Sequence, residues 1–123
     1  MEKIKGIIEN VRLCNIYDLF TRKPQGLKFN ETDAIVITAR TEDGNRITET
    51  FYFCLKADGT FDAKPINMGS GTLARRHKLV SFLEYYGIAE NVKHYNIKKN
   101  IDEWKGRNIE VVLSENERWV YIP

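Results

Sequence analysis

Five strand-like segments and one helical segment follow one another in an order that few folds can accommodate. Alternating or β-branched runs occupy residues 3–13, 34–40, 46–55, 108–113 and 118–122, and the one long run with helical periodicity, residues 72–86, lies between the third and the fourth. A small sheet must close its edges and cover its open end, and a helix after the third strand supplies that cover. We therefore expect one mainly β domain over residues 1–123, a five-stranded barrel with one helix between strands three and four.

The second and third runs indicate which face of the sheet is buried. Apolar and polar residues alternate along both runs, which is typical of a sheet with one face in the core and one in water. The segment 42–45, Glu-Asp-Gly-Asn, indicates a hairpin between them. The inward face is predicted to hold Ile35, Ile37, Ala39, Ile47, Glu49, Phe51, Phe53 and Leu55. The outward face is predicted to hold Val36, Thr38, Arg40, Thr48, Thr50, Tyr52 and Cys54.

The first run departs from simple alternation. Ile7, Val11 and Leu13 are predicted to share one face, which Glu9 interrupts. Gly6 lies inside this run, and a glycine within a strand often marks a bulge or a bend at a barrel corner. We therefore expect the first strand to bend near Gly6.

The helical run has an apolar stripe and recognisable ends. Ser70 or Thr72 is placed to cap its start, and Gly87 stands where a left-handed C-terminal cap is common. The basic group at 75–78 is interpreted as a solvated helix start, because consecutive helical residues point in different directions. Residues 100–104 are expected to form one further helical turn with Asn100 as its cap. The stripe predicted to face the core consists of Leu73, Leu79, Val80, Phe82, Leu83 and Tyr86, with Lys78, Ser81 and Tyr85 on the opposite side.

Composition excludes several classes of protein. The 123 residues are 42% hydrophobic and 29% charged, with a formal net charge of +2, which is an ordinary globular balance. No apolar run approaches the roughly 18–20 residues that span a bilayer, and the first residues, Met-Glu-Lys-Ile-Lys, lack the apolar core of a secretion signal. Cys14 and Cys54 do not make a disulfide framework and are expected to be free, buried thiols. We therefore expect a cytoplasmic protein without a membrane partner.

The sequence contains no catalytic or cofactor motif with the required spacing. The segment 68–73, Met-Gly-Ser-Gly-Thr-Leu, resembles a phosphate-binding loop but lacks the Lys-Ser/Thr pair of the P-loop and the spacing of the dinucleotide fingerprint, so we interpret it as a helix cap. Cys14, Cys54, His77 and His94 do not have the spacing of a zinc site. No pair of acidic residues stands out as a general acid and base. We therefore expect no cofactor, no metal and no enzymatic activity.

The predicted element order is that of the OB fold, whose barrel binds oligonucleotides and oligosaccharides on the face of strands two and three and with the adjoining loops. Proteins that hold single strands combine aromatic platforms for the bases with Lys and Arg along the phosphates. The long connection at 14–33 is aromatic and basic, and the outward strand faces add similar side chains. The predicted nucleic-acid site consists of Tyr17, Phe20, Arg22, Lys23, Lys28, Phe29, Arg40, Tyr52, Lys56, Trp119 and Tyr121.

Each part of this predicted site has a structural alternative. The aromatic residues of the 14–33 connection could pack that connection onto the barrel instead of binding a ligand. Trp119 and Tyr121 share one face of the last strand, opposite Val120 and Ile122, and could cap the barrel. The scattered basic residues between 93 and 107 could extend a phosphate track or be ordinary surface charge.

The C-terminal half resembles a known family. The helix end Leu-Glu-Tyr-Tyr-Gly-Ile at 83–88, the segment Trp-Lys-Gly-Arg-Asn-Ile-Glu-Val-Val-Leu at 104–113 and a last strand ending at Pro123 are similar to the pattern of small phage-type OB-fold single-stranded-DNA-binding proteins. The resemblance covers residues 73–123. It implies an OB fold and binding to single strands during replication or repair.

Together these features predict a protein that binds single-stranded DNA with weak sequence preference, in replication, recombination or repair, by base stacking and phosphate contacts. Two alternatives stay open: single-stranded RNA as the ligand, and an OB-fold protein-interaction module or assembly subunit on the same barrel. The pattern also allows a homo-oligomer, and replication or repair proteins as further partners.

Overall fold

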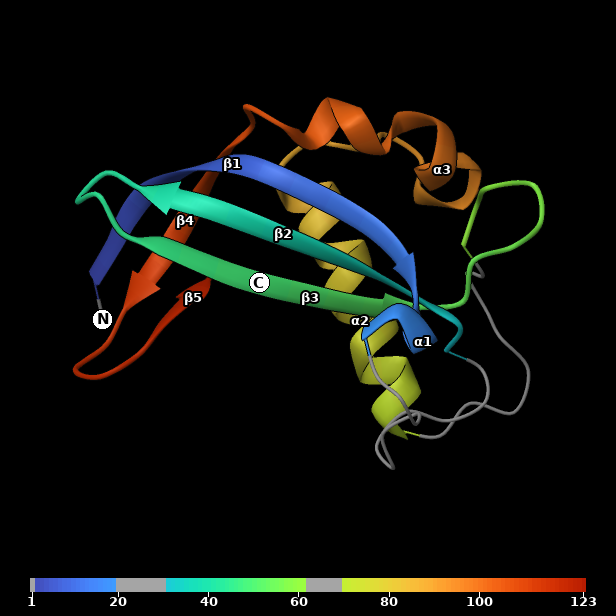
Figure 1. Ribbon diagram of the computed structural model, residues 1–123, viewed down its shortest axis with the longest axis horizontal. Helices are drawn as coiled ribbons and strands as arrows, with labels where there is room; N and C mark the ends of the chain where they lie inside the picture. The colour runs from blue at the N-terminus through green and yellow to red at the C-terminus, as the bar shows by residue number, and fades with distance from the viewer. Residues whose placement is uncertain (1, 20–30, 62–69) are drawn as a thin grey trace.

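One antiparallel sheet is the framework of the part of the chain that the structure describes. The structure is a computed structural model and describes residues 2–19, 31–61 and 70–123. The strands follow the order β3-β2-β1-β4-β5 across the sheet, and neighbouring strands are antiparallel (Figure 1). Their bounds are β1 (Glu2–Asn15), β2 (Asp33–Thr41), β3 (Arg46–Phe53), β4 (Asn108–Leu113) and β5 (Arg118–Val120).

β1 is the strand around which the sheet curls. It pairs with β2 from Gly6 to Asn15 and with β4 from Glu2 to Ile7. A strand that pairs with different partners along its two halves bends between them, and the edge strands β3 and β5 thereby come into contact. The result is a nearly closed, barrel-shaped sheet with a helix between β3 and β4, which confirms the predicted mainly β architecture.

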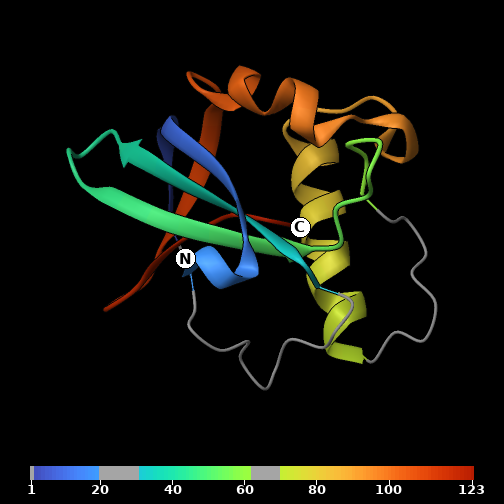
Figure 2. The ribbon, with the colours of Figure 1, turned by 45° about the vertical axis from the view of Figure 1, so that its right-hand side comes forward.

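The helix α2 (Ser70–Tyr85) packs against the concave side of the sheet (Figures 1 and 2). Leu79, Phe82 and Leu83 are fully buried. The Phe82 ring lies 4.7 Å from the ring of Phe51 on β3 and 5.5 Å from that of Trp104, centre to centre. The predicted helix and the core-facing part of its stripe are confirmed at these positions.

The ends of α2 and the connection to β4 agree with the sequence in part. Gly87 has a φ of +65°, the left-handed conformation expected of the C-terminal cap. Thr72 lies inside the described helix and therefore cannot cap its start. Asn91 and Asn96 cap two short helices with their side chains, whereas Asn100, the predicted cap, makes no side-chain cap hydrogen bond. The short helices are η1 (Val92–His94), α3 (Ile97–Asn100) and η2 (Ile101–Trp104).

The alternation predicted for the second and third strands is confirmed. Ile35 and Ile37 of β2 are fully buried, and Phe51 and Phe53 of β3 are nearly so, all in one core with α2. The strand ends differ slightly from the prediction, because β3 stops at Phe53 and β5 at Val120. Leu55, predicted to belong to the third strand, forms an isolated bridge after its end.

The face predicted for the first strand is wrong at Ile7. Ile7 is 48% exposed, whereas Ile8 is buried beside Val11. The register between β1 and β2 shifts between Ile8 and Asn10, so a bulge moves the inward positions by one residue. Gly6 does not form this bulge; it faces β4, where a Cβ would lie 3.2 Å from Val111. A one-residue slip exchanges the two faces of a strand, which is why the predicted alternation fails on one side of the bulge.

The basic residues at the start of α2 are not a solvated helix start. Nη2 of Arg75 lies 2.8 Å from Oε1 of Glu31, whose side chain is 1% exposed. Lys78, predicted to lie opposite the core-facing stripe, pairs with Glu49 of β3 and donates to the Thr50 carbonyl oxygen at 3.3 Å. The interpretation was wrong because both cations meet carboxylates from distant parts of the chain. These pairs fasten α2 to the sheet and cover part of the β3 edge.

The β2–β3 hairpin is tied to the start of β5. Gly44 has a φ of +87° in the predicted turn. Asp43 accepts a hydrogen bond from the Thr41 hydroxyl and another from Nη1 of Arg118 at 2.9 Å. These two contacts, Thr41 first, lower the pKa of Asp43 to about 2. Because Arg118 begins β5, the ion pair links the two edges of the curled sheet.

Neither cysteine takes part in a disulfide, as expected. Cys14 is buried and Cys54 is partly buried. Burial raises the pKa of the Cys14 thiol, which therefore stays protonated at neutral pH. No helix within residues 2–19, 31–61 or 70–123 has the length and apolarity that crossing a membrane requires.

Candidate nucleic-acid interface

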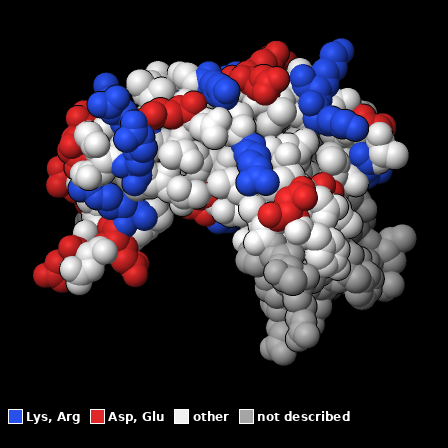
Figure 3. All heavy atoms as spheres, viewed as in Figure 1, with Lys and Arg blue, Asp and Glu red and all other residues white. Residues whose placement is uncertain are grey.

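The outward residues of β1, β2 and β3 form cross-strand rows, which we call the sheet face. Figure 3 looks onto this face and shows uncharged atoms over its middle, a group of Lys and Arg side chains at the left-hand end, and Asp and Glu side chains around them. Such a surface suits an extended ligand that alternates bases and phosphates. The rows are Cys14, Ala34 and Tyr52; Arg12, Val36 and Thr50; Asn10, Thr38 and Thr48; and Ile7, Arg40 and Arg46.

Arginines of the sheet face differ in how far they are neutralised. Arg12 and Arg40 are exposed, and neither has a carboxylate within salt-bridge distance among the described residues. Arg46, which stands opposite Arg40, places its Nε 3.1 Å from Oε1 of Glu9. Arg12 and Arg40 are therefore the cations of this face that a phosphate can approach without displacing an ion pair.

Tyrosines lie at one end of the sheet face. Tyr52 is partly buried against a small apolar cluster beneath the helix α1 (Ile16–Leu19), and burial raises the pKa of its hydroxyl. Tyr17 of α1 is 66% exposed. Asn15 holds the start of α1. Its side-chain oxygen accepts from the backbone N–H of Tyr17 at 2.9 Å, and its own backbone N–H donates to the Asp18 carboxylate at 2.9 Å. The Tyr17 side chain is therefore exposed to solvent, and the Tyr52 side chain is exposed only in part.

The turn that follows β3 is joined to α3, and both segments carry exposed lysines. Lys56 is exposed at the start of this turn. Further along the same turn, the Gly59 carbonyl oxygen accepts hydrogen bonds from the backbone amides of Ile97 and Lys98 at 2.9 and 3.3 Å. This contact brings the turn beside α3, as Figures 1 and 2 both show. Lys98 and Lys99 of α3 are also exposed. The tertiary fold therefore joins the turn that carries the predicted Lys56 to a helix more than 40 positions away in the sequence.

Trp119 and Tyr121 lie away from the sheet face. They line a pocket of about 710 Å³ where the C-terminal segment approaches β3 and the first half of α2, which we call the seam pocket. Figure 2 shows the C-terminal end of the chain beside α2. Its lining includes the side chains of Lys3, Glu49, His77, Lys78, Trp119 and Tyr121.

The predicted site residues thus fall into three groups. Tyr17, Arg40 and Tyr52 belong to the sheet face or its margin, and Lys56 lies just beyond the end of β3. Trp119 and Tyr121 belong to the seam pocket. Phe20, Arg22, Lys23, Lys28 and Phe29 lie outside the residues that the structure describes.

Arg12 is a sheet-face residue that the predicted site lacks. It stands between Val11, which is buried, and Leu13, which is partly buried against the core. Alternation with these two inward residues is the signal that could have identified it. Lys98 and Lys99 belong to the basic stretch between 93 and 107, whose role the sequence left open, and the contact between α3 and the turn places that part of the stretch beside the turn after β3.

Within the described ranges, no group of three or more His, Cys, Asp or Glu side chains is placed to hold a metal ion. The loop 68–73 enters the described residues only at Ser70, where α2 begins.

Only geometry and charge support this interface, because comparison with known proteins gave no match. No family model, no curated protein and no solved structure matches this chain.

Proposed function

We propose that the protein is an OB-fold domain that binds single-stranded DNA with weak sequence preference, in replication, recombination or repair. A partly open barrel of five strands is the OB architecture, and its usual ligand surface is the face of strands two and three. The nearly closed five-stranded sheet supports this assignment.

The observation that carries the proposal is the arrangement of Tyr17, Tyr52, Arg12 and Arg40 along the sheet face. From the Ala34 row to the Arg40 row β2 advances about 20 Å, at roughly 3.4 Å per residue. That length accommodates a few nucleotides, at the short end of the roughly 4–16 nucleotides that one OB fold covers. Bases would stack on the tyrosines, and phosphates would approach the two unpaired arginines.

The test is a fluorescence-anisotropy titration of labelled oligo-dT at low and high salt, with the matching oligo-U as a second arm. Affinity should fall as salt rises, because phosphate contacts release counterions. The double variant Arg12→Gln/Arg40→Gln should bind at least about tenfold more weakly and lower the log–log salt slope by about 1.4, at roughly 0.7 per phosphate contact. Tighter binding of oligo-U would make RNA the ligand.

A matched control removes two exposed lysines of the connection between α2 and β4, as Lys93→Gln/Lys105→Gln. This variant loses the same formal charge and should keep most of the affinity. An equal loss in both double variants would place the site away from the sheet face. No binding at micromolar protein in low salt would reject the proposal.

A second candidate, a protein-interaction module, is favoured by the exposed Ile7. This side chain lies in a hollow of about 570 Å³ that Lys5, Glu9, Arg40 and Glu42 also line. An apolar centre with a polar rim is the usual layout of a protein contact surface. A light-scattering mass that rises with concentration, drops in Ile7→Ser and ignores added oligonucleotide would favour this candidate.

A further inference from the structure

The walls of the seam pocket are apolar and partly aromatic. Val112 alternates with the core residue Val111 and so points out of the barrel, yet it is only 3% exposed. Trp119 stands opposite it in register on β5. Trp119 is itself partly exposed, so its indole forms a wall of the pocket rather than filling it. A volume of about 710 Å³ lies in the range of small-molecule sites.

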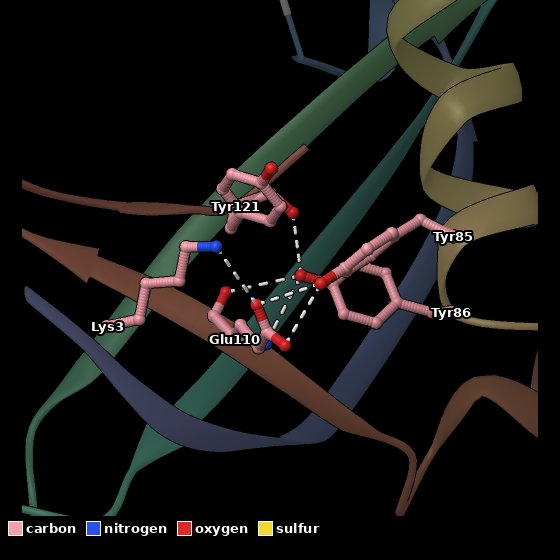
Figure 4. Close-up of polar contacts among 5 residues, drawn as sticks. All are labelled: Lys3, Tyr85, Tyr86, Glu110 and Tyr121. Carbon is pink, nitrogen blue, oxygen red and sulfur yellow. Dashed lines mark hydrogen bonds and ion pairs between the residues drawn. The ribbon is translucent and has the colours of Figure 1, made fainter. Parts of the chain in front are cut away.

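A cation with an exchangeable partner stands at the rim of this pocket. Nζ of Lys3 lies 3.5 Å from the centre of the Tyr121 ring and 3.7 Å from Oε2 of Glu110 (Figure 4). The two charged side chains are 46% and 41% exposed, and ion pairs at such sites are weak. Glu110 also accepts from the Tyr85 hydroxyl at 3.0 and 3.1 Å. Lys3 can therefore turn to an anion while Glu110 keeps a hydrogen-bond donor.

The other side chains of the lining that can carry a charge are already engaged. Lys78 pairs with Glu49, so these two charges cancel. Nε2 of His77 lies 3.3 Å from the Ser81 hydroxyl. Lys3 is therefore the positive group of the lining that is best placed to hold a ligand anion.

We propose that the seam pocket binds a mononucleotide, with its base against the Trp119 indole and its phosphate on Lys3. A phosphate alone would leave the aromatic wall unused, and an apolar side chain would leave Lys3 unused, whereas a nucleotide uses both. The inference takes its ligand class from the proposed function. It uses none of the residues of the sheet face, so the two surfaces can be tested apart.

The chain carries its own reporter for this pocket. It has two tryptophans, of which Trp104 is fully buried and Trp119 lines the pocket. Thymidine monophosphate should quench tryptophan fluorescence saturably, with half-saturation below about 1 mM, the weak end of specific binding. Thymidine should bind at least about fivefold more weakly, and inorganic phosphate should give no quenching. Absence of saturable quenching would overturn the inference.

Lys3→Met and Lys5→Met form a matched pair, because both remove one exposed lysine of β1 but only Lys3 lines the pocket. Lys3→Met should weaken the binding of thymidine monophosphate at least about fivefold and leave the affinity for thymidine unchanged. Lys5→Met should change neither affinity. Equal losses in both variants would contradict the assignment of the phosphate to Lys3. Quenching that persists in Trp119→Phe would show that Trp104 responds, and would place the ligand elsewhere.

Failure of the two proposals can be told apart with Arg12→Gln/Arg40→Gln. This variant should lose oligo-dT affinity and keep the quenching by thymidine monophosphate. Quenching without any oligo-dT binding by the wild type would reject the proposed function and support the pocket. Oligo-dT binding without quenching would support the function and reject the pocket.

Discussion

The sheet face and the seam pocket use similar residue types in different arrangements. On the sheet face, Arg12 and Arg40 stand in separate rows of paired strands and Tyr52 lies at one end. In the seam pocket, Trp119 and the Lys3–Tyr121 pair surround one hollow. Paired strands spread their side chains along a line, which suits an extended ligand. In the seam pocket, side chains from different elements surround one cavity, which suits a small compact ligand.

The two regions also differ in what holds them together. The sheet face lies on the backbone ladders between β1, β2 and β3, which one bulge between Ile8 and Asn10 interrupts. The position of α2, which lines the seam pocket, depends on side-chain contacts. These include Arg75 with Glu31 and Lys78 with Glu49. Single substitutions of side chains should therefore disturb the seam pocket before they disturb the sheet face.

The largest expected effect is that of Arg75→Met. Removing the guanidinium breaks its ion pair with the buried Glu31 carboxylate, and breaking a buried pair costs about 3 kcal/mol of unfolding free energy. Urea denaturation measures the loss, with Lys93→Met as the exposed control. Quenching by thymidine monophosphate should weaken more than oligo-dT binding, since α2 lines the pocket and Arg75 ties α2 to Glu31. A loss below about 1 kcal/mol would show that the Arg75–Glu31 pair contributes no more than an exposed ion pair.

Tyr17→Ala and Tyr52→Ala should separate ligand binding from stability on the sheet face. Each should weaken oligo-dT binding by about 1–3 kcal/mol, the value of stacking one base. Tyr17 is 66% exposed, so its substitution should leave the thermal midpoint unchanged. Tyr52 packs on the cluster beneath α1, so its substitution should lower the midpoint as well. Unchanged anisotropy titrations for both variants would remove the tyrosines from the interface.

Tyr86→Phe tests the seam with the loss of one oxygen atom. The Tyr86 hydroxyl donates to the Tyr121 carbonyl at 2.6 Å and accepts from the Glu110 amide at 3.2 Å, joining the C-terminal segment to β4 (Figure 4). Its loss should cost about 1 kcal/mol of unfolding free energy. Burial raises the pKa of Tyr86 to about 12, so the difference from wild type should stay constant across neutral pH. A difference that changes between pH 6 and pH 8, roughly, would contradict this account.

Asp43→Asn should have the smallest effect and a defined pH dependence. The pKa of Asp43 is lowered from 3.8 to about 2 in the folded protein, so its contribution to stability is present above the unfolded value. The contribution is lost as pH falls through about 2. The wild type and Asp43→Asn should therefore differ at neutral pH and converge in acid, in thermal melts at low salt. A difference that persists at the acid end would mean that Asp43 acts through its shape rather than its charge.

The strand faces could be predicted wherever alternation runs without interruption. Ile35, Ile37 and Phe51 face the core as expected, because side chains of a regular strand point to opposite sides in turn. Ile7 does not, because the bulge between Ile8 and Asn10 shifts the inward set. Glu9 breaking the apolar pattern was the only local sign of that bulge.

The candidate site could be predicted in part for the same reason. Arg40 and Tyr52 were assigned to the outward face because they alternate with buried residues, and the register places them there. The partners of Arg75 and Lys78 could not be predicted, since Glu31 and Glu49 lie 44 and 29 positions away in the chain. Local charge patterns do not indicate which carboxylate a helix meets after it packs.

By itself, the sequence determined the number and order of the strands, the helix between the third and fourth, and the inward faces of β2 and β3. These follow from local periodicity, which depends on neighbouring residues alone. Only the tertiary structure decided where β5 lies relative to β3 and α2, and with it the place of Trp119, Tyr121 and Lys3 in one pocket. Such placement depends on packing between segments far apart in the chain, and the curl of β1 between its two partner strands sets that packing.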